Sequence, residues 1–180
     1  MSVASISPLQ PSEPAVTEVA FRDFCRKLTA GVAVVTSSGA AWSGTTVSTV
    51  TSVSMNPPVL LFCISSGSGT LAAIRRSGRF AVHLLSERQP SLADRFSRPT
   101  GSQSRFVGEE LDAQLVGGVP VISEVLAVGW CAVHTLHEVG DHVVVYGCLS
   151  SASVGQGTPL VWHNRDYRRL GSASPQWRAP

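Results

Sequence analysis

The strongest constraint on the fold is a pair of apolar segments in the second half of the chain. Residues 127–138 (AVGWCAVHTLHE) and 142–151 (HVVVYGCLSS) are rich in β-branched and aromatic residues, and only Val-Gly-Asp separates them. Such segments favour strands, and a short connection that contains Gly140 and Asp141 is typical of a hairpin turn. The sequence therefore predicts two antiparallel strands. The expected core residues of this hairpin include Trp130 and Tyr146.

The rest of the chain indicates further short strands joined by short helices. Strands are expected at 32–36, 43–54, 59–64, 79–85 and 159–164. Helices are expected from an N-cap at Thr17 to Gly31, over 70–77 with Gly78 as the stop, and within 86–97. Many short strands with few helices favour a mainly β fold, a closed β-barrel with helical additions.

The length and the two ends indicate one domain. We expect a single folded domain over 17–170, preceded by a disordered Ser- and Pro-rich segment, 1–16, and followed by a flexible tail, 171–180. The beginning of the chain has neither the basic region nor the apolar region of a signal peptide. The four cysteines stand singly in apolar surroundings, as is typical of buried thiols in a reducing compartment. The sequence therefore predicts a cytoplasmic protein.

Charged residues are scarce, which bears on the partners of the chain. They make up 14% of the sequence, against about 25% in an ordinary soluble domain. This scarcity favours a surface that is partly covered, most simply by a second copy of the chain in a homodimer. The basic residues form no stripe with interleaved aromatic residues, which argues against nucleic acid. No apolar run approaches the roughly 18 residues of a membrane span.

Side-chain machinery for catalysis is sparse. His134 and His137 lie an odd number of residues apart, so a regular strand would place them on opposite faces, and we expect no metal site. The sequence contains no Gly-x-Ser-x-Gly elbow and no nucleophilic cysteine signature. This leaves two possibilities: an enzyme whose chemistry resides in a cofactor, or a protein that is not an enzyme.

Two hydroxyl-rich segments are candidate binding elements. The loop Ser65–Thr70 (SSGSGT) joins the strand at 59–64 to the expected helix. Its hydroxyls and the free N–H groups at the helix start could surround a phosphate, or Ser68 could simply cap the helix. The strand at 43–54 has Ser or Thr at eight of its twelve positions, on both faces. It could line a flat heterocycle, or it could be an exposed Thr-rich strand.

Taken in order, these segments resemble the short-chain flavin reductase family. The resemblance runs from about Phe21 to Leu170, and four segments carry it: 28–36 (LTAGVAVVT), 42–70 (WSGTTVSTVTSVSMNPPVLLFCISSGSGT), 77–85 (SGRFAVHLL) and 140–147 (GDHVVVYG). It implies a flavin-binding split β-barrel that forms a homodimer. It also implies transfer of a hydride from NADH or NADPH to FMN or FAD. The reduced flavin would then serve a separate flavin-dependent monooxygenase.

The resemblance also implies the site residues. The edge of the flavin ring is expected to meet Thr46, Val47, Ser48 and Thr49, with Val53 and Ser54 just beyond. The flavin phosphate is expected to meet Cys63, Ser65, Ser68, Gly69, Thr70 and Leu71, while Arg105 and Phe106 close over the flavin. The nicotinamide nucleotide is expected to meet His142, which is also the expected catalytic residue, together with Trp162, His163, Asn164 and Arg165.

The sequence departs from the family pattern in three places. The family often has Gly-Met-Thr where this chain has Gly44-Thr45-Thr46. Near the C-terminus, His163 occupies the second position of an aromatic pair, and Arg165 stands where the family has glycine. The loop Ser65–Thr70 contains no basic residue. One alternative stays open: a split-barrel protein that is not a reductase, such as an oxidase or a flavin-, deazaflavin- or haem-binding protein.

Overall fold

A computed structural model describes residues 16–98, 103–106 and 112–171. The two segments expected to be disordered or flexible, 1–16 and 171–180, lie almost wholly outside these residues. Within the described part, no helix is long and apolar enough to cross a membrane.

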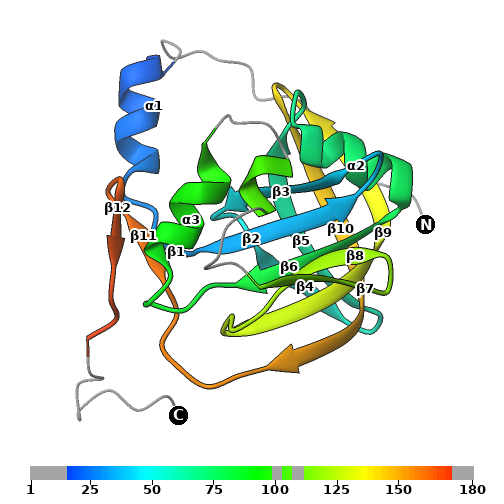
Figure 1. The fold of residues 1–180 in the computed structure, drawn as a ribbon. Coiled ribbons are helices and arrows are strands. Elements are labelled where there is room, and N and C mark those ends of the chain that lie inside the picture. The colour runs from blue at the N-terminus through cyan, green and yellow to red at the C-terminus, as the bar shows by residue number, and fades with distance from the viewer. Residues whose placement is uncertain (1–15, 99–102, 107–111, 172–180) are drawn as a thin grey trace.

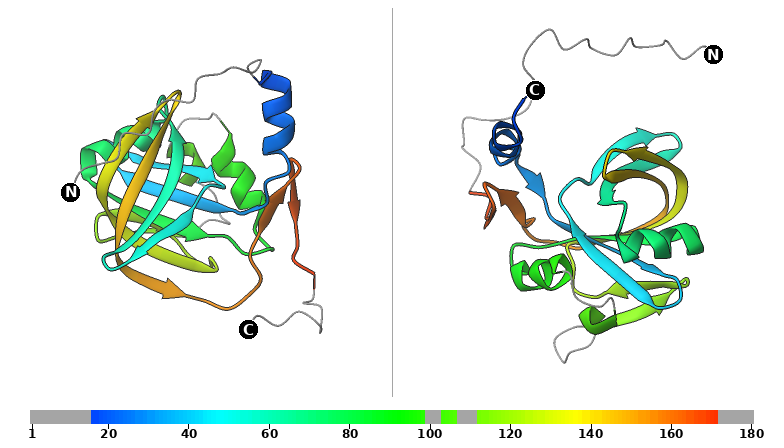
Figure 2. Two further views of the ribbon diagram at one scale, coloured as in Figure 1. Left: turned by 180° about the vertical axis from the view of Figure 1, so that it is seen from behind. Right: turned by 90° about the horizontal axis from the view of Figure 1, so that it is seen from above.

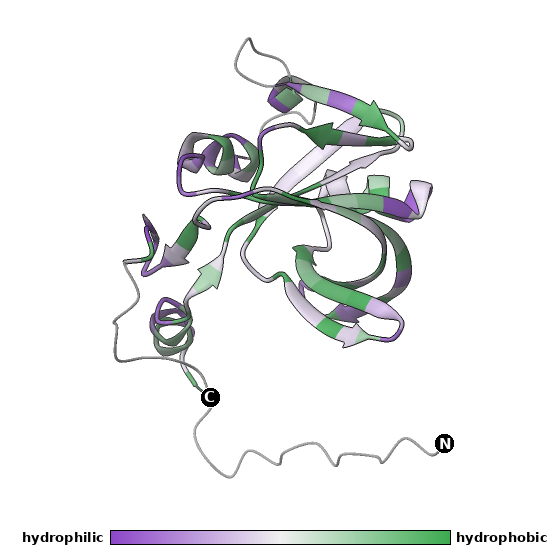
Figure 3. Cartoon of the chain, turned by 90° about the horizontal axis from the view of Figure 1, so that it is seen from below, coloured by the Kyte–Doolittle hydropathy of each residue, from purple (hydrophilic) through white to green (hydrophobic). Residues whose placement is uncertain are grey.

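The centre of the molecule is a seven-stranded antiparallel sheet that curls around an apolar interior (Figures 1 and 2). In sheet order its strands are β3 (Trp42–Val47), β2 (Ala33–Ser38), β6 (Arg79–Leu84), β9 (Ala127–Val139), β10 (His142–Val154), β5 (Pro58–Ser65) and β4 (Thr51–Met55). The curled strands carry long hydrophobic stretches in Figure 3. The mainly β architecture is confirmed.

The barrel is not closed, so the expectation of a closed barrel is wrong. Strands β3 and β4 follow each other in the chain but form the two edges of the sheet, and no ladder of the described residues joins them. The expected single strand at 43–54 is therefore two strands. The break comes at 48–50, where the chain crosses the split: the Thr49 hydroxyl accepts a hydrogen bond of 2.9 Å from the Cys63 N–H on β5. The result is a split barrel.

The predicted hairpin of β9 and β10 is confirmed. Its turn is Gly140-Asp141, with Gly140 at a φ of 58°, and Val139 pairs with His142. Two irregularities in the register bend the hairpin around the interior. Beside one of them, Gly147 leaves room for the ring of Phe80, because any Cβ there would overlap that ring.

The helices begin as the sequence predicts, but the first one ends early. Helix α1 (Glu18–Cys25) starts at Thr17, whose side chain accepts a hydrogen bond from the Ala20 N–H. It stops at Cys25 rather than at Gly31, because residues 30–31 turn away as the short strand β1 (Ala30–Gly31). Helix α2 (Gly69–Ser77) ends as predicted at Gly78, whose φ is 68°. Helix α3 (Pro90–Ser97) and the 3-10 turn η1 (Gln103–Phe106) complete the set.

Two small sheets accompany the barrel. The hairpin of β7 (Ala113–Val116) and β8 (Val119–Ile122), which the sequence analysis did not predict, packs on the outer face of the large sheet. The strand expected at 159–164 is the shorter β11 (Val161–His163). It pairs with β1 and with β12 (Asp166–Arg168).

A buried histidine connects three strands through hydrogen bonds. His83 on β6 is fully buried; its Nδ1 lies 3.0 Å from the Val34 carbonyl on β2, and its Nε2 accepts a 3.1 Å hydrogen bond from the Ile122 N–H on β8. Burial lowers the pKa of His83 to about 4. The side chain is therefore neutral near pH 7, with Nδ1–H donating to the carbonyl.

Candidate functional site

The hydroxyl-rich loop after β5 and the turn of the long hairpin lie against each other. In the ladder between β5 and β10, Ser65 pairs with His142. One residue further on, both the N–H and the hydroxyl of Ser66 donate to the Asp141 carbonyl, at 3.0 and 3.1 Å. Two segments that are far apart in the chain therefore form one edge of the barrel, because antiparallel pairing aligns the end of one strand with the start of the other.

His142 is held by its neighbour at this edge. Its Nδ1 lies 2.8 Å from the Asp141 carboxylate, and both side chains are exposed. The hydrogen bond from His142 lowers the pKa of Asp141. Asp141 is therefore an ionised acceptor near neutral pH, which fixes the proton of His142 on Nδ1. The opposite nitrogen, Nε2, is left to meet a ligand.

At the start of α2, Ser68 caps the helix: its side chain accepts a 3.2 Å hydrogen bond from the Thr70 N–H. The Thr70 hydroxyl is buried and bonds to Ser43 at 3.0 Å. Gly67 and Gly69 face open space, since only Ser43 Oγ, at 3.9 Å from Gly69, comes within 4 Å of a Cβ built on either. As the first residue of the helix, Gly69 also has no intrahelical partner for its N–H. The loop thus has the room and the donors for an anion in addition to the cap.

A small pocket of about 170 Å³ lies where β3 ends. It is lined by Val32, Thr46, Val47, Ser48, Asp94, Ser97, Trp162 and Tyr167. The rings of Trp162 and Tyr167 meet edge to face with centroids 5.0 Å apart, and the Tyr167 hydroxyl donates to Asp94 at 3.0 Å. Burial is the main cause that raises the pKa of Tyr167 to about 12, so the phenol stays protonated. The pocket brings predicted flavin-side residues together with Trp162.

Sequence reasoning did not assign Asp94 or Tyr167 to the site. Tyr167 belongs to the C-terminal pattern that supports the resemblance, so a signal for it existed. No sequence signal marked Asp94, because it joins the pocket only through the packing of α3 against β3. The Thr46 hydroxyl also connects β3 to α3, because it donates a hydrogen bond of 2.6 Å to the Ala93 carbonyl.

Arg105 and Phe106 fasten η1 to β3. Arg105 donates to the Gly44 carbonyl at 2.5 Å and also to the carbonyl of Arg98, and burial lowers the pKa of its guanidinium. The Phe106 ring packs edge to face on Phe96, with centroids 5.1 Å apart. Both side chains thus pack against β3 and α3, two elements that line the pocket.

The remaining predicted residues are more dispersed. Val53 and Ser54 lie on the edge strand β4, Leu71 is buried in the interior, and Cys63 is half-buried on β5. The other three lie at the β11–β12 end: His163 Nδ1 is 2.8 Å from the Thr29 hydroxyl, and Asn164 and Arg165 form the turn with φ values of 51° and 62°. Among the described residues, no three His, Cys, Asp or Glu side chains gather where they could hold a metal ion.

Comparisons with known proteins agree with this architecture. Residues 25–171 match the family described as the flavin reductase like domain. A protein of Rhizobium meliloti (strain 1021) named "Probable flavin reductase" is 37% identical over 134 residues. The match covers 73% of this chain and 42% of that relative, so this chain spans less than half of it. A protein of Methylorubrum extorquens named "FMN reductase (NADH) RutF 1" is 33% identical over 167 residues, which are 92% of this chain and 83% of the relative.

A solved structure shares the fold. BorF, the flavin reductase component of a bacterial two-component tryptophan halogenase, superimposes with a TM-score of 0.78 at 25% identity, over 87% of this chain and all of BorF. The fold and the site define a split-barrel protein of the flavin reductase class. The chain belongs to the flavin reductase like domain family.

Proposed function

We propose that this chain is an NADH-dependent flavin reductase that transfers a hydride to FMN or FAD. Its family and the name of the Methylorubrum extorquens relative support this activity. One observation carries the proposal: the exit of β3, the Ser65–Ser68 loop and the Gly140–His142 turn meet at one end of the split barrel. The Thr49–Cys63 bond and the Ser66–Asp141 bonds join them.

The flavin ring would lie against the exit of β3. Residues 46–48 offer backbone amides and hydroxyls there, and Trp162 offers an aromatic surface. A flavin bound there would supply the electron-accepting N5 atom needed for hydride transfer from a reduced nicotinamide. The role of the protein chain is to hold the two rings at reacting distance. It also presents hydrogen-bond donors to the negative charge that grows near N1 and O2 of the flavin.

The flavin phosphate would lie at the start of α2. The N–H groups of Gly67 and Gly69 and the positive end of the helix favour an anion, and among the described residues only Ser43 Oγ, 3.9 Å from the Cβ position of Gly69, comes near the two glycines. The loop contains no Lys or Arg. Neutral donors alone bind a phosphate with moderate affinity, which suits a flavin that must leave after it has been reduced.

His142 would position the nicotinamide nucleotide. With Nδ1 bonded to Asp141, its Nε2 accepts a hydrogen bond from the carboxamide when the ring is neutral, and donates one to a phosphate when it is charged. The reaction needs no side-chain nucleophile, which explains why the sequence carries so little acid–base machinery.

We also propose a cytoplasmic homodimer that supplies reduced flavin to a monooxygenase component. The supply role is supported by the likeness to BorF, which is itself the reductase of a two-component system. The homodimer is supported by the apolar side chains of α1, none of which is buried in the protomer. The cytoplasmic location is supported by four free cysteines, since disulfides are rare in a reducing compartment.

The test is the oxidation of NADH by the purified protein, with and without added FMN, FAD or riboflavin, and the same series with NADPH. We expect oxidation that depends on added flavin. If no combination gives turnover although the protein binds flavin, the chain is a flavin-binding protein and not a reductase.

The role of His142 is tested separately. His142→Ala should raise the KM for NADH about tenfold, since one hydrogen bond to the nucleotide is lost, with flavin affinity unchanged. His137→Ala is the matched control, because His137 is also an exposed histidine of the same hairpin but lies on β9. Equal KM values in the two variants would remove His142 from the nucleotide site while leaving the reductase activity in place.

A further inference from the structure

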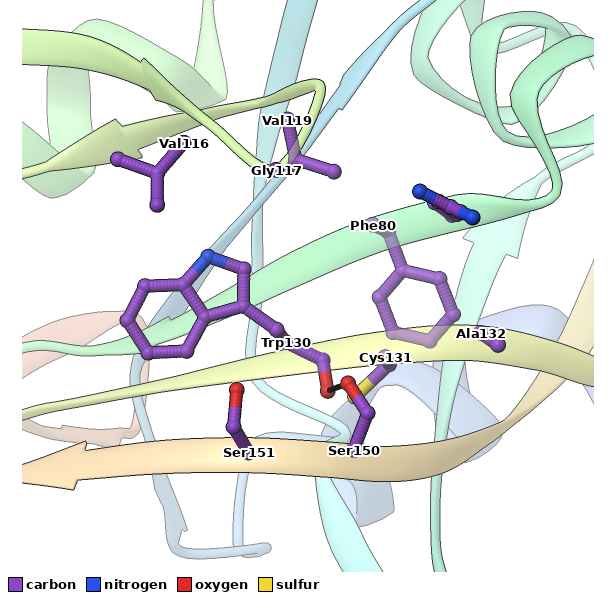
Figure 4. A pocket seen from close by; sticks show the side chains of 10 residues that line it. Phe80, Val116, Gly117, Val119, Trp130, Cys131, Ala132, Ser150 and Ser151 are labelled. Atoms are coloured by element: carbon purple, nitrogen blue, oxygen red, sulfur yellow. Dashed lines mark hydrogen bonds between the residues drawn. The ribbon is translucent and has the colours of Figure 1, made fainter.

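A second pocket lies on the outer face of the barrel, away from the residues assigned to flavin and nucleotide. The β7–β8 hairpin covers part of this face and leaves a pocket of about 550 Å³ beside strands β6, β9 and β10 (Figure 4). Pockets that bind small organic ligands have volumes of roughly 300–1,000 Å³. None of the lining residues belongs to the proposed flavin site.

The register of the sheet gives the pocket a flat floor around one tryptophan. Trp130 on β9 pairs with Ala81 on β6 and with Ser151 on β10, and the next outward pair is Ala132 with Arg79. Small neighbours leave the indole ring uncovered along one side, while Val119 of β8 packs in the same cluster. Trp130 is therefore not a residue of the barrel interior, as the expected hairpin core implied, but part of the outer face.

The indole nitrogen of Trp130 is buried and has no hydrogen-bond partner among the described residues. Buried N–H groups in native proteins are almost always paired, so an orphan at the edge of a pocket indicates a missing acceptor. In Figure 4 this nitrogen edge faces the Gly117 turn above it. Gly117 and Gly118 have φ values of 60° and 82°, and no atom of the described residues lies within 4 Å of a Cβ built on either. Open space therefore lies beside this turn.

The charge of the pocket favours an anion. The Arg79 side chain is exposed at one end and forms no ion pair with any residue of the described part of the chain. No Asp, Glu or His of the described residues lines the pocket, so a cationic ligand would find no partner, whereas a carboxylate would find Arg79.

We propose that this pocket binds a small aromatic carboxylate. Its ring packs against the indole of Trp130 and the side chain of Val119. Its carboxylate lies toward Arg79, and one oxygen of the ligand accepts the hydrogen bond of the Trp130 N–H. The site is separate from the proposed reductase activity and does not depend on it.

The test is an NMR titration of the full chain that follows the indole N–H resonances. Trp130→Phe identifies the resonance of Trp130 by removing it. Benzoate should shift that resonance saturably, and benzamide, which has the same ring without the charge, should bind about tenfold more weakly. Arg79→Gln should weaken benzoate binding about tenfold. Arg76→Gln is the control, since Arg76 is also exposed but lies on α2, and it should leave binding unchanged.

Three outcomes would overturn the proposal. The first is a Trp130 resonance that does not move with benzoate at concentrations up to about 10 mM. The second is binding that Arg79→Gln does not weaken, or that benzamide equals. The third is a shift of the Trp42 or Trp162 resonance in place of Trp130, which would put the ligand beside the proposed flavin site. None of these bears on flavin-dependent NADH oxidation, so the two proposals fail independently.

Discussion

The interior of the barrel and helix α1 contain the same kinds of apolar side chain but use them differently. Inside the barrel, Phe62 and Phe80 are fully buried, and their rings meet edge to face with centroids 5.3 Å apart. On α1, Phe21 and Phe24 are 56% and 66% exposed, and no residue of the helix is buried. The helix stands away from the barrel in Figure 2. Apolar composition alone therefore does not tell which residues stabilise the protomer.

The contacts that attach α1 to the rest of the chain explain why its apolar face is not packed against the barrel. The segment that follows the helix reaches the small sheet through polar contacts: the Asn164 N–H donates to the Arg26 carbonyl at 3.0 Å, and Thr29 bonds to His163 at 2.8 Å. Neither contact buries the phenylalanines. The interior stabilises one chain, whereas the apolar face of α1 is left for a second surface, which in our proposal is the partner protomer.

The largest expected effect comes from the same substitution made in the two regions. Phe62→Ala should lower the free energy of unfolding by about 3–5 kcal/mol, because it leaves a cavity in a packed interior. Phe24→Ala should change it by less than about 0.5 kcal/mol, as an exposed substitution does. Urea unfolding at low protein concentration, where protomers are separate, measures both. Similar losses in the two variants would mean that α1 packs on its own barrel in solution.

The second prediction concerns pH and the buried His83, which lies under β8 on the outer face of the large sheet. His83 titrates near 4 in the folded protein, below its ordinary value of 6.5, so between these values the unfolded chain binds more protons. Stability contributed by neutral His83 is therefore complete above about pH 6.5 and falls by roughly 3 kcal/mol as the pH drops to 4. Across this range, the free energy of unfolding should change more steeply with pH for the wild type than for His83→Gln. Parallel curves would contradict the burial of a neutral imidazole.

The third prediction concerns Gly44 on β3, the strand whose end lines the candidate site. A Cβ at Gly44 would be 2.7 Å from the Phe96 ring and 3.2 Å from the Phe106 ring. Gly44→Ala should cost about 1–3 kcal/mol through overpacking. It should also weaken flavin binding, because Phe96 and Phe106 pack in the same cluster as Trp162 and Tyr167, which line the pocket. Gly31→Ala is the control, since no atom lies within 4 Å of its Cβ position. Equal stability of the two variants would show that η1 does not pack there.

Local sequence signals predicted what depends on neighbours in the chain. The Gly140-Asp141 turn, the Thr17 cap and the Gly78 stop are all of this kind, and the structure confirms each. The hairpin of β7 and β8 was missed although Gly117-Gly118 between apolar residues is itself a turn signal. Its strands have only four residues each, and one contains proline.

Features that arise between distant elements could not be predicted from local pattern. The break in the strand at 43–54 depends on the bond of Thr49 to Cys63 across the split. Within the candidate site, the meeting of Ser66 with Asp141 and of Asp94 with Tyr167 likewise depends on tertiary packing. The family resemblance indicated that the Ser65–Thr70 loop and the Gly140–His142 turn belong to one site. Periodicity and composition predicted each of these segments but did not relate one to the other.

The last prediction concerns the exposed phenylalanines of α1, whose substitution is expected to change the stability of the protomer least. Phe21→Ser combined with Phe24→Ser should change the free energy of unfolding of the separate protomer by less than about 0.5 kcal/mol. In the proposed homodimer, the same variant should shift the protein from dimer to monomer, because two aromatic side chains would be lost from the interface between the copies. Light scattering coupled to size-exclusion chromatography measures the mass.

Val154→Ser is the matched control for this last experiment. Val154 is 79% exposed but lies at the end of β10, not on α1, so it should leave the mass unchanged. A double variant that stays dimeric would separate the exposed phenylalanines from the dimer interface. The difference between the two regions would then need another cause, such as contact of α1 with the proposed monooxygenase component.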